Sequence, residues 1–396
     1  MYSIRDPIHG FIRVDPLEAA LLDSRPMQRL RFIHQLGLTF LVFPGAEHSR
    51  FSHALGTMHL AGRVYDAVAD KSAGELPLGP MARERRLVRA AALLHDIGHA
   101  PFSHSAENLF EAGIDHEDMT GLLLETEEMQ EVFRRHGDGL SSDDVRRVLS
   151  KSGDGFDHLL SQIVTSELDV DKMDYLLRDS LYCGVQYGSY DLERLIEMVE
   201  PVLDPNNGRW RVGFAHGGVH ALEALVMARY YMFTQVYFNE TSKVMELHFA
   251  EWLRRRNVEW PGDPEAFLEH DDLKVLTDMR QSDDPHARAI VHRERFSLAH
   301  ETAEHLSPDE RQRFLELVPT LEQEFGDQLL IDNSAKDPHR LEKNRVWVRR
   351  FDGSLQPISE ASDFIGKLSR IECFRVYSPK KLRREVHERV EELLAR

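Results

Sequence analysis

The chain has 396 residues, of which 42% are hydrophobic and 29% charged, a composition that supports a large buried core and excludes a disordered protein. Its 49 lysines and arginines against 67 aspartates and glutamates give a formal net charge of −18, which argues against a nucleic-acid partner bound through its phosphates. The sequence shows no apolar run long enough to span a membrane, no secretory signal, and only two widely spaced cysteines, so we expect a cytoplasmic protein without a membrane partner.

The N-terminal part of the chain is predicted to be extended first and helical afterwards. Residues 1–17 contain two prolines as breakers, and from residue 17 to about residue 260 the apolar pattern is mostly helical. A period close to 3.6 residues predicts a helix over Pro26–Leu36. The segment Met81–His95 ends in alanines and leucines that are apolar on nearly every side, which predicts a buried helix stopped near Gly98.

Three further elements are expected before residue 261. Glu167–Asp179 forms another candidate helix. The turn-rich segment Asp204–Gly208 lies between apolar residues and predicts a β-hairpin. His216–Arg256 has no proline, and no glycine after Gly218, so it is predicted to form one long helix.

The character of the sequence changes beyond Pro261. Residues 262–325 are charged and predicted to be helical. After Gly326 the strand-like segments are Gln328–Ile331, Arg345–Phe351 and Phe374–Tyr377, with a terminal amphipathic helix from Pro379. The predicted fold class is therefore mainly α, with a helical body over residues 1–260, a helical extension over 261–325 and a small α+β lobe over 326–396.

The strongest local feature is the segment His95–His104, which opens with a His-Asp pair and contains two further histidines. An imidazole beside a carboxylate at the end of a buried helix is costly unless both are paired or bind a cation. A helix-terminal histidine next to a hydrogen-bonded Asp96 is the alternative interpretation. His99 and His104, so close behind, favour the functional interpretation.

Two other segments carry polar residues at helical spacing. Arg50 and His53 are three positions apart and would share one helix face. Residues 171–178 form a polar stripe that is unusual for a core helix, although an exposed acidic face would explain it as well. Two imidazoles and two carboxylates would suit a divalent transition metal or Mn²⁺, and they come from His53, His95, Asp96 and Asp171.

The order of these residues resembles the metal signature of HD-domain phosphohydrolases, and further motifs resemble those of the SAM-and-HD-domain dNTP triphosphohydrolases. The matching segments extend over about residues 5–240: Asp6–Gly10, Gln28–Arg31, Gln35–Gly37, Val42–Ala46, Arg50–His53, His95–His104, His116–Glu117 and Asp169–Tyr175. The resemblance implies an HD-domain helical bundle whose core spans about residues 48–180. It also implies the reaction dNTP + water → deoxynucleoside + triphosphate.

The resemblance assigns one divalent metal ion, which could be Fe, Mn, Zn, Ni, Co or Mg, to the four ligands His53, His95, Asp96 and Asp171. Additional Mg²⁺ would accompany the nucleotide. Catalytic roles are implied for four more residues. By the resemblance, His99 and His104 contact the phosphates, His116 protonates the leaving 5′ oxygen, and Glu117 keeps that imidazole protonated. Without the resemblance His116 would be interpreted as a surface histidine.

Substrate contacts are implied for eight residues that match the family. The cations that would face the phosphates are Arg50, Lys172 and Arg229. The residues that would surround the deoxyribose are Gln35 and Asp179 at its 3′-OH, Leu36 and Tyr237 as a wall that excludes a 2′-OH, and Tyr175 stacked nearby. Arg229 and Tyr237 are eight positions apart, so on one helix they would share a face.

A regulatory nucleotide site is a further expectation from the resemblance. Members of this family often bind GTP or a dNTP between subunits and assemble into tetramers, so a homodimer or homotetramer is expected. The matching positions are Asp23, Gln28 and Arg31 for a guanine and Arg194 for a phosphate. The segment Ala215–Gly218 lacks the Arg/Lys pair expected before the long helix, and no sterile-alpha-motif domain is found. Nucleotide activation is therefore a hypothesis.

Two other functions are compatible with the sequence. One is an HD phosphohydrolase for another nucleotide or phosphorylated metabolite, and the other is a nucleotide-sensing module without turnover. The match at Gln35–Leu36 and at Arg229 and Tyr237 favours the triphosphate substrate. The intact metal ligands, together with His116 and Lys172, argue against a module without turnover.

Overall fold

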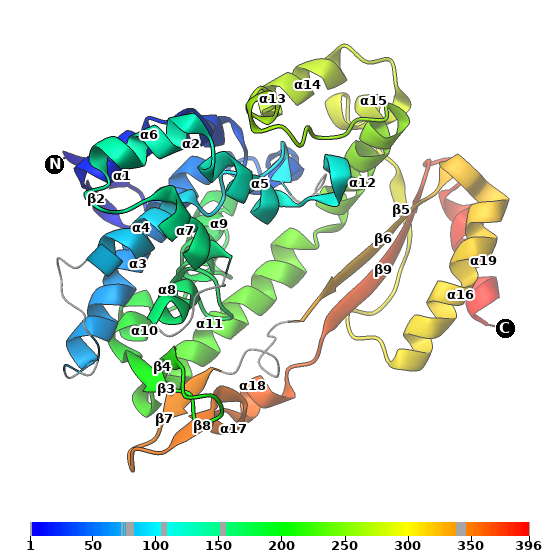
Figure 1. The fold of residues 1–396 in the computed structure, drawn as a ribbon. Helices are drawn as coiled ribbons and strands as arrows, with labels where there is room; N and C mark the ends of the chain where they lie inside the picture. Colours follow the sequence, from blue (N-terminus) through cyan, green and yellow to red (C-terminus); the bar gives the residue numbers. More distant parts are fainter. Residues whose placement is uncertain are drawn as a thin grey trace.

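The computed structural model describes residues 2–72, 74, 76, 83–103, 109–150, 156–337 and 346–395. Helices dominate this part of the chain, which confirms the predicted mainly α class (Figure 1). Three small sheets accompany them, with the strand orders β1-β2, β3-β4-β7-β8 and β5-β9-β6. Among the described residues, no helix combines the length and the apolar character needed to cross a membrane.

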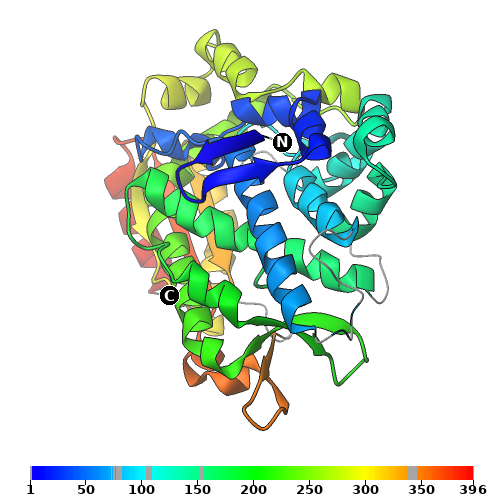
Figure 2. The same ribbon diagram turned by 90° about the vertical axis from the view of Figure 1, so that its left-hand side faces the viewer.

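An N-terminal hairpin precedes the first helices (Figure 2). Its strands are antiparallel, β1 (Tyr2–Asp6) and β2 (Gly10–Val14), and the elements that follow are α1 (Pro16–Leu22), α2 (Arg25–Arg29), η1 (Leu30–Phe32) and η2 (Gly37–Leu41). The prediction of a helix over Pro26–Leu36 is therefore wrong beyond Phe32. The physical reason is tertiary: the backbone N–H of His34 donates to Asp272 Oδ2 at 2.7 Å instead of to a carbonyl in the preceding helical turn, and the backbone at Ile33 is already extended.

The helical body is built on three long helices. They are α3 (Arg50–Lys71), α4 (Arg83–Leu94) and α9 (Val170–Cys183), surrounded by η4 (Glu111–Gly113), α5 (His116–Leu124), α6 (Glu127–His136), α7 (Ser142–Leu149), α8 (Phe156–Val164) and α10 (Leu192–Met198). The predicted buried helix corresponds to α4, whose residues 87–94 are all buried. The Asp169 side chain caps α9 by accepting from Lys172 N, and Gly184 ends it with φ 70° in the left-handed region.

The long helix predicted over His216–Arg256 is interrupted in the structure. The β3 (Val199–Leu203) and β4 (Trp210–Ala215) hairpin confirms the predicted turn, and the segments after it are η5 (His216–Gly218), α11 (Val219–Met232), the π-helical η6 (Phe233–Tyr237) and α12 (Glu240–Arg255). The break has a local cause, because the Asn239 side chain accepts from the backbone N–H groups of Thr241 and Ser242 and starts a new helix. The π-turn lies at the site described below.

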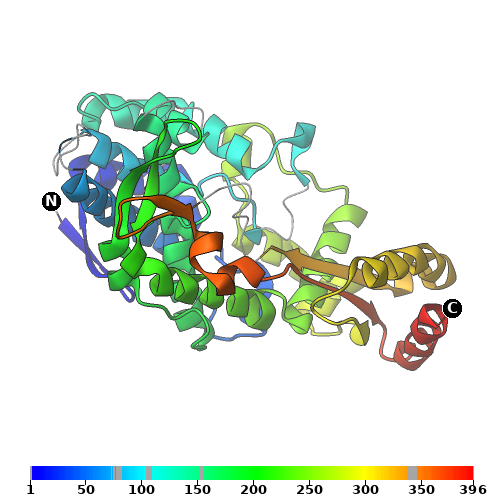
Figure 3. The same ribbon diagram turned by 90° about the horizontal axis from the view of Figure 1, so that it is seen from below.

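The C-terminal part combines helices with two sheets (Figure 3). Its elements are α13 (Pro264–Leu268), α14 (Asp272–Arg280), α15 (Pro285–Val291), β5 (Ser297–Glu301), α16 (Pro308–Phe325), η7 (Gly326–Gln328), β6 (Leu330–Lys336), β7 (Trp347–Arg349), β8 (Leu355–Pro357), α17 (Ile358–Ala361), α18 (Asp363–Lys367), β9 (Ile371–Ser378) and α19 (Arg383–Leu394). The prediction of helix throughout 262–325 is wrong at β5, because this strand pairs with β9 far along the chain. The domain division stays a prediction, and β7 pairs with β4 of the helical body.

Candidate active site

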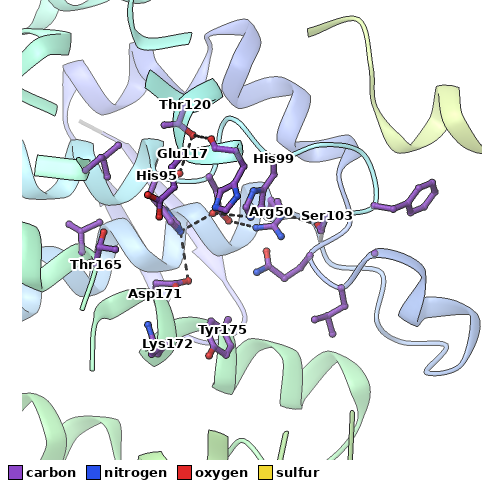
Figure 4. Close-up of a pocket in the computed structure, with 18 of the residues that line it drawn as sticks. Arg50, His95, His99, Ser103, Glu117, Thr120, Thr165, Asp171, Lys172 and Tyr175 are labelled. Carbon is purple, nitrogen blue, oxygen red and sulfur yellow. Dashed lines mark hydrogen bonds and ion pairs between the residues drawn. The ribbon is translucent and has the colours of Figure 1, made fainter. Parts of the chain in front are cut away.

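Three elements bring the predicted metal donors together, and Figure 4 shows two of these donors, His95 and Asp171. His53 lies on α3, His95 lies in the turn after α4, and Asp171 lies in the first turn of α9. His53 Nε2 is 3.1 Å and His95 Nε2 is 3.7 Å from Asp171 Oδ1. One ligand atom from each of the three residues lies within 4.8 Å of the other two, so a single ion could contact all three.

The fourth predicted donor, Asp96, borders the same point. Its Oδ1 lies 3.2 Å from His95 Nε2, and its Oδ2 lies 3.8 Å from His53 Nε2. Oδ2 also accepts from Arg50 Nη1 at 2.5 Å. Burial alone would raise the pKa of Asp96, but His95 and Arg50 hold this pKa well below its usual range. Asp96 is therefore ionised, and one of its two oxygens is hydrogen-bonded to Arg50.

The two imidazoles are held from behind, as metal-binding histidines usually are. His95 Nδ1 donates to the carbonyl oxygen of Ala92 at 2.8 Å, which places the lone pair of the neutral ring on Nε2. This Nε2 is buried and makes no hydrogen bond in the described structure. His53 Nδ1 donates to Asp174 Oδ2 at 2.8 Å, so its Nε2 also points at the carboxylates. A buried nitrogen that has carboxylate oxygens at 3.2 and 3.7 Å but makes no hydrogen bond fits a divalent cation.

Asp174 is the centre of a buried hydrogen-bond hub formed with His9, His53 and Arg178. The sequence predicted Asp174 only as part of a polar stripe, without a role. Its two oxygens accept from His53 Nδ1 at 2.8 Å, from His9 Nε2 at 2.7 Å, and from Arg178 Nε and Nη2 at 2.8 and 2.9 Å. Arg178 Nη1 donates in addition to Asp6 at 2.9 Å. The hub thus connects the N-terminal hairpin to a metal donor through charged hydrogen bonds.

Charge around the histidines follows from these contacts. Burial alone would lower the pKa of His53, but hydrogen bonds to Asp171 and Asp174 raise it to about 10. Burial would raise the pKa of Asp171, but His53 and His95 lower it well below its usual range. The carboxylates therefore stay ionised, and a proton or a metal ion can neutralise them.

The donors open onto a cavity of about 960 Å³. Most of the residues predicted for substrate and catalysis line this cavity: Gln35, Leu36, Arg50, His95, Asp96, His99, His116, Glu117, Asp171, Lys172, Tyr175, Asp179, Arg229 and Tyr237. His53 lies behind the wall, fully buried. His104, predicted as a phosphate contact, lies outside the described residues.

Arg50 is fixed by side chains on both sides of the cavity wall. Besides the bond to Asp96, its Nε donates to Ser103 Oγ at 2.9 Å. Its third nitrogen, Nη2, makes no hydrogen bond within the described residues and is available to an anion in the cavity. Because the guanidinium is planar, the bonds made by Nε and Nη1 also fix the direction of Nη2.

The other two predicted cations also have carboxylate partners, which the sequence analysis missed. Lys172 Nζ donates to Asp169 Oδ2 at 2.8 Å, and Arg229 Nη1 donates to Glu167 Oε1 at 2.8 Å. Burial alone would lower the pKa of Lys172, but Asp169 and Asp171 raise it, so the ammonium keeps its charge. The only sequence signal for these partners was the acidic run that precedes α9.

The predicted sugar-binding residues form another part of the wall. Gln35 is buried, and its Oε1 makes no hydrogen bond in the described structure. Asp179 accepts from His48 Nε2 at 2.7 Å and from Tyr237 Oη at 2.8 Å. The rings of Tyr175 and Tyr237 meet edge to face with centroids 6.3 Å apart. The predicted wall therefore carries hydrogen bonds of its own.

The predicted catalytic histidines face each other across a tight turn. The rings of His99 and His116 have centroids 4.2 Å apart, and His116 begins α5. The turn can approach α5 because a Cβ on Gly98 would lie 2.2 Å from the carbonyl oxygen of His116. Glu117, next along α5, is exposed at the cavity edge.

The predicted regulatory residues lie outside this cavity. Gln28 and Arg31 contact each other, with Arg31 Nε donating to Gln28 Oε1 at 2.9 Å, and Asp23 precedes them in the same region. Arg194 lies on α10, which Figure 1 places at a distance from α2 in the helical body. Within one chain, the structure does not bring Arg194 together with the other three.

Further cavity residues were not predicted from the sequence. Five of them come from the segment that runs from η6 through α12 and from β6: Phe233, Phe238, Lys243, Glu246 and Lys336. Lys243 Nζ donates to Glu246 Oε2 at 2.8 Å, and Lys336 Nζ lies 5.1 Å from the Phe233 ring centroid. No local motif marks them, because β6 begins 75 residues after the end of α12 and meets this helix only in the folded chain.

The fold and parts of the sequence match known families and structures. Residues 50–179 match the HD domain, and residues 190–395 match the HD associated region. A solved structure of a hypothetical protein from Aquifex aeolicus matches with a TM-score of 0.82 and 30% identity, over 98% of this chain and 99% of that chain. A phosphohydrolase structure from Bacteroides thetaiotaomicron matches with a TM-score of 0.76 and 26% identity, over 95% and 99% of the two chains.

Several curated relatives have names that state an activity. The deoxynucleoside triphosphate triphosphohydrolase SAMHD1 homolog of Dictyostelium discoideum is 32% identical over 299 residues, which are 71% of this chain and 51% of that protein. The chain spans about half the length of this relative, and it covers 55% of another curated relative, from Bacillus subtilis. All four predicted metal donors lie inside the segment that matches the HD domain.

Proposed function

The chain belongs to the HD-domain family of phosphohydrolases, with its HD associated region, and from this premise we propose that it hydrolyses dNTPs to deoxynucleoside and triphosphate. The observation that carries the proposal is the cavity, in which His95, Asp96 and Asp171 share one wall with three paired cations. The similarity to a dNTP triphosphohydrolase supports the same substrate class.

The HD donors would hold one divalent metal ion, with His53, His95, Asp96 and Asp171 as its ligands. Such an ion supplies Lewis-acid polarisation of a phosphate oxygen when it is bound. The carboxylates stay ionised to receive it, and the two imidazoles present Nε2 because their Nδ1 protons are engaged by Ala92 and Asp174.

The cations would hold the triphosphate in place. Arg50 offers its Nη2, while the half-buried Lys172 and the buried Arg229 line the cavity as paired charges. Because their carboxylate partners fix these side chains before substrate arrives, little reorganisation is needed when negative charge spreads over the phosphates. His99 and His116 lie together at the cavity, and His116 would protonate the leaving 5′ oxygen.

Selection for deoxyribose would come from Gln35, Leu36 and Tyr237. The buried Oε1 of Gln35 can accept from a sugar hydroxyl, which would give this unpartnered oxygen its hydrogen bond. Tyr237 is held by Asp179, so its ring is a fixed wall. A rigid wall at the sugar can exclude a larger substrate by steric overlap.

The test is product analysis with the metal-loaded protein. It is incubated with dNTPs, NTPs, dNMPs and cyclic nucleotides, and the products are identified. The expected result is inorganic triphosphate from dNTPs alone. Cleavage of monophosphates or cyclic nucleotides instead would assign another HD phosphohydrolase activity, and saturable binding without turnover would assign a sensing module. Asp171→Ala and His95→Ala should each remove turnover.

Nucleotide activation is the second part of the proposal and rests on the matches at Asp23, Gln28, Arg31 and Arg194. Because Arg194 is separated from the other three within one chain, a shared site would form between copies in a homodimer or homotetramer. Turnover of one dNTP is measured with and without GTP, together with the mass of the particle in solution. Turnover and mass that are both unchanged by GTP would contradict this part.

A further inference from the structure

A second group of potential metal ligands lies in the C-terminal lobe, on the elements β5 and α19. The residues are His300 on β5 and His387 and Glu391 on α19. One ligand atom from each lies within 4.8 Å of the other two, and His300 Nδ1 is 3.1 Å from Glu391 Oε1. Figures 1 and 3 show α19 beside the β5-β9-β6 sheet, at a distance from the helical body that holds the HD donors.

An irregularity in β5 directs His300 toward the helices. The register between β5 and β9 shifts between Leu298 and His300, which leaves one extra residue, Ala299, on this strand. Ala299 packs in the core of the lobe, and the His300 ring stacks on Phe314 of that same core with a centroid distance of 6.2 Å. Regular alternation would send consecutive residues to opposite faces, so the bulge is what lets both face the helices.

The orientation of His387 is fixed in the manner of a metal ligand. Its Nδ1 donates to the carbonyl oxygen of Ala299 at 3.0 Å, so the lone pair of the neutral ring lies on Nε2. His95 at the HD site is held by Ala92 in the same way. Glu391 is four positions after His387 and therefore shares its helix face.

We propose that His300, His387 and Glu391 form a second, separate site for a divalent transition metal of the zinc type, which clamps the terminal helix α19 to β5. Two imidazoles and one carboxylate, with water in the remaining position, are a ligand set that Zn²⁺ accepts. Tetrahedral Zn²⁺ with bonds of about 2.0 Å needs ligand atoms about 3.3 Å apart. His300 and Glu391 are already this close, and no two of the three donor atoms are more than 4.8 Å apart, so any closing movement is at most about 1.5 Å. The Glu391 side chain is 55% exposed and can make that movement.

The experiment counts zinc ions in the full chain, without an affinity tag. Protein stripped with a chelator is loaded with Zn²⁺, separated from free metal and analysed for metal content. Two ions per chain are expected for the unsubstituted protein, one for His387→Ala and one for Asp171→Ala. The variant with both substitutions should bind none. Turnover is not the readout, so the result does not depend on the proposed reaction.

Glu391→Gln repeats the test with a milder change, and Glu388→Gln is its matched control. Glu388 lies on the same helix and pairs only with Arg384 within the described structure. Zn²⁺ should raise the thermal stability of the Asp171→Ala protein, and this increase should be lost with Glu391→Gln but kept with Glu388→Gln. Equal zinc content in His387→Ala and the unsubstituted protein would overturn the proposal, because the loss of His387 should remove one zinc ion whatever metal the HD donors hold.

Discussion

His53 and Asp174 are joined by a hydrogen bond of 2.8 Å that lies entirely inside the protein. The bond fixes the ring of a metal donor, while the same carboxylate receives two nitrogens of Arg178. Metal affinity and folding therefore depend on one side chain that would not itself touch the metal. Hydrogen-bond partners of this kind usually change metal affinity by about 10–100-fold.

We expect Asp174→Asn to weaken metal binding by about 10–100-fold and to lower the free energy of unfolding by about 3–5 kcal/mol, since it leaves Arg178 facing an amide. Competition with a chelating dye gives the affinity, and urea denaturation gives the stability. The matched control is Asp70→Asn, an exposed position on α3. Unchanged metal affinity in a folded Asp174→Asn protein would refute the positioning role.

Gly56 on α3 allows this hub to exist. A Cβ at this position would lie 1.8 Å from Asp174 Oδ1 and 2.5 Å from Arg178 Nη2. Gly56→Ala should therefore displace the buried ion pair and destabilise the protein by about 3 kcal/mol or more, measured by urea denaturation. Gly121→Ala on α5 is the control, because its Cβ would meet only Arg146 Cδ at 4.0 Å, and it should stabilise by about 0.5–1 kcal/mol. Equal effects of the two substitutions would contradict the steric argument.

Local sequence patterns predicted the elements whose ends are set locally. The alanine-rich α4 and the turn between β3 and β4 carry their own signals, and both are found near the predicted positions. The segment Pro26–Leu36 has a helical period as well, but a bond from His34 N to Asp272 ends the helix early. Such a partner lies far along the chain, so no window around the segment contains the information.

In the site, too, the residues with a local sequence signal were predicted, and those set by distant contacts were not. The metal donors are recognisable because His95 and Asp96 are adjacent and break the apolar character of a helix end. The partners of the cations are acidic residues among many others in a chain with 67 of them, so composition alone could not select Glu167. Lys336 joins the cavity through the pairing of distant strands, which only the folded structure determines.

Two substitutions of Tyr237 distinguish steric exclusion by its ring from hydrogen bonding by its hydroxyl in the proposed sugar pocket. Its hydroxyl donates to Asp179, which His48 also holds. Tyr237→Phe keeps the ring, so we expect discrimination between dNTP and NTP to persist, with a loss in kcat/KM of about tenfold, equivalent to about 1.4 kcal/mol. Tyr237→Ala removes the wall and should let NTPs be hydrolysed. Both ratios come from kcat/KM with dGTP and GTP. Equal discrimination in both variants would show that the ring is not the wall.

His248 and His286 form a buried pair that should make the protein sensitive to acid. His248 Nε2 accepts from the backbone N–H of Phe296 at 3.1 Å, so its proton is on Nδ1, which lies 2.8 Å from His286 Nδ1. Burial, with the nearby His286, lowers the pKa of His248 to about 3, against about 6.5 in an unfolded chain. Between these values the unfolded chain binds more protons, so stability is complete above about pH 6.5 and falls as the pH decreases.

The expected loss from His248 is about 2 kcal/mol between pH 6.5 and pH 5, because each pH unit below the unfolded pKa costs about 1.4 kcal/mol. His248→Gln has no titrating group, so its unfolding free energy should depend less steeply on pH over this range. His220→Gln is the control, because the side chain of His220 is 94% exposed and should leave the slope unchanged. Urea denaturation at pH 5, 6 and 7.5 measures how the unfolding free energy of the unsubstituted protein and of the two variants depends on pH. If His248→Gln had the same pH dependence as the unsubstituted protein, His248 would not be the group through which acid destabilises the fold.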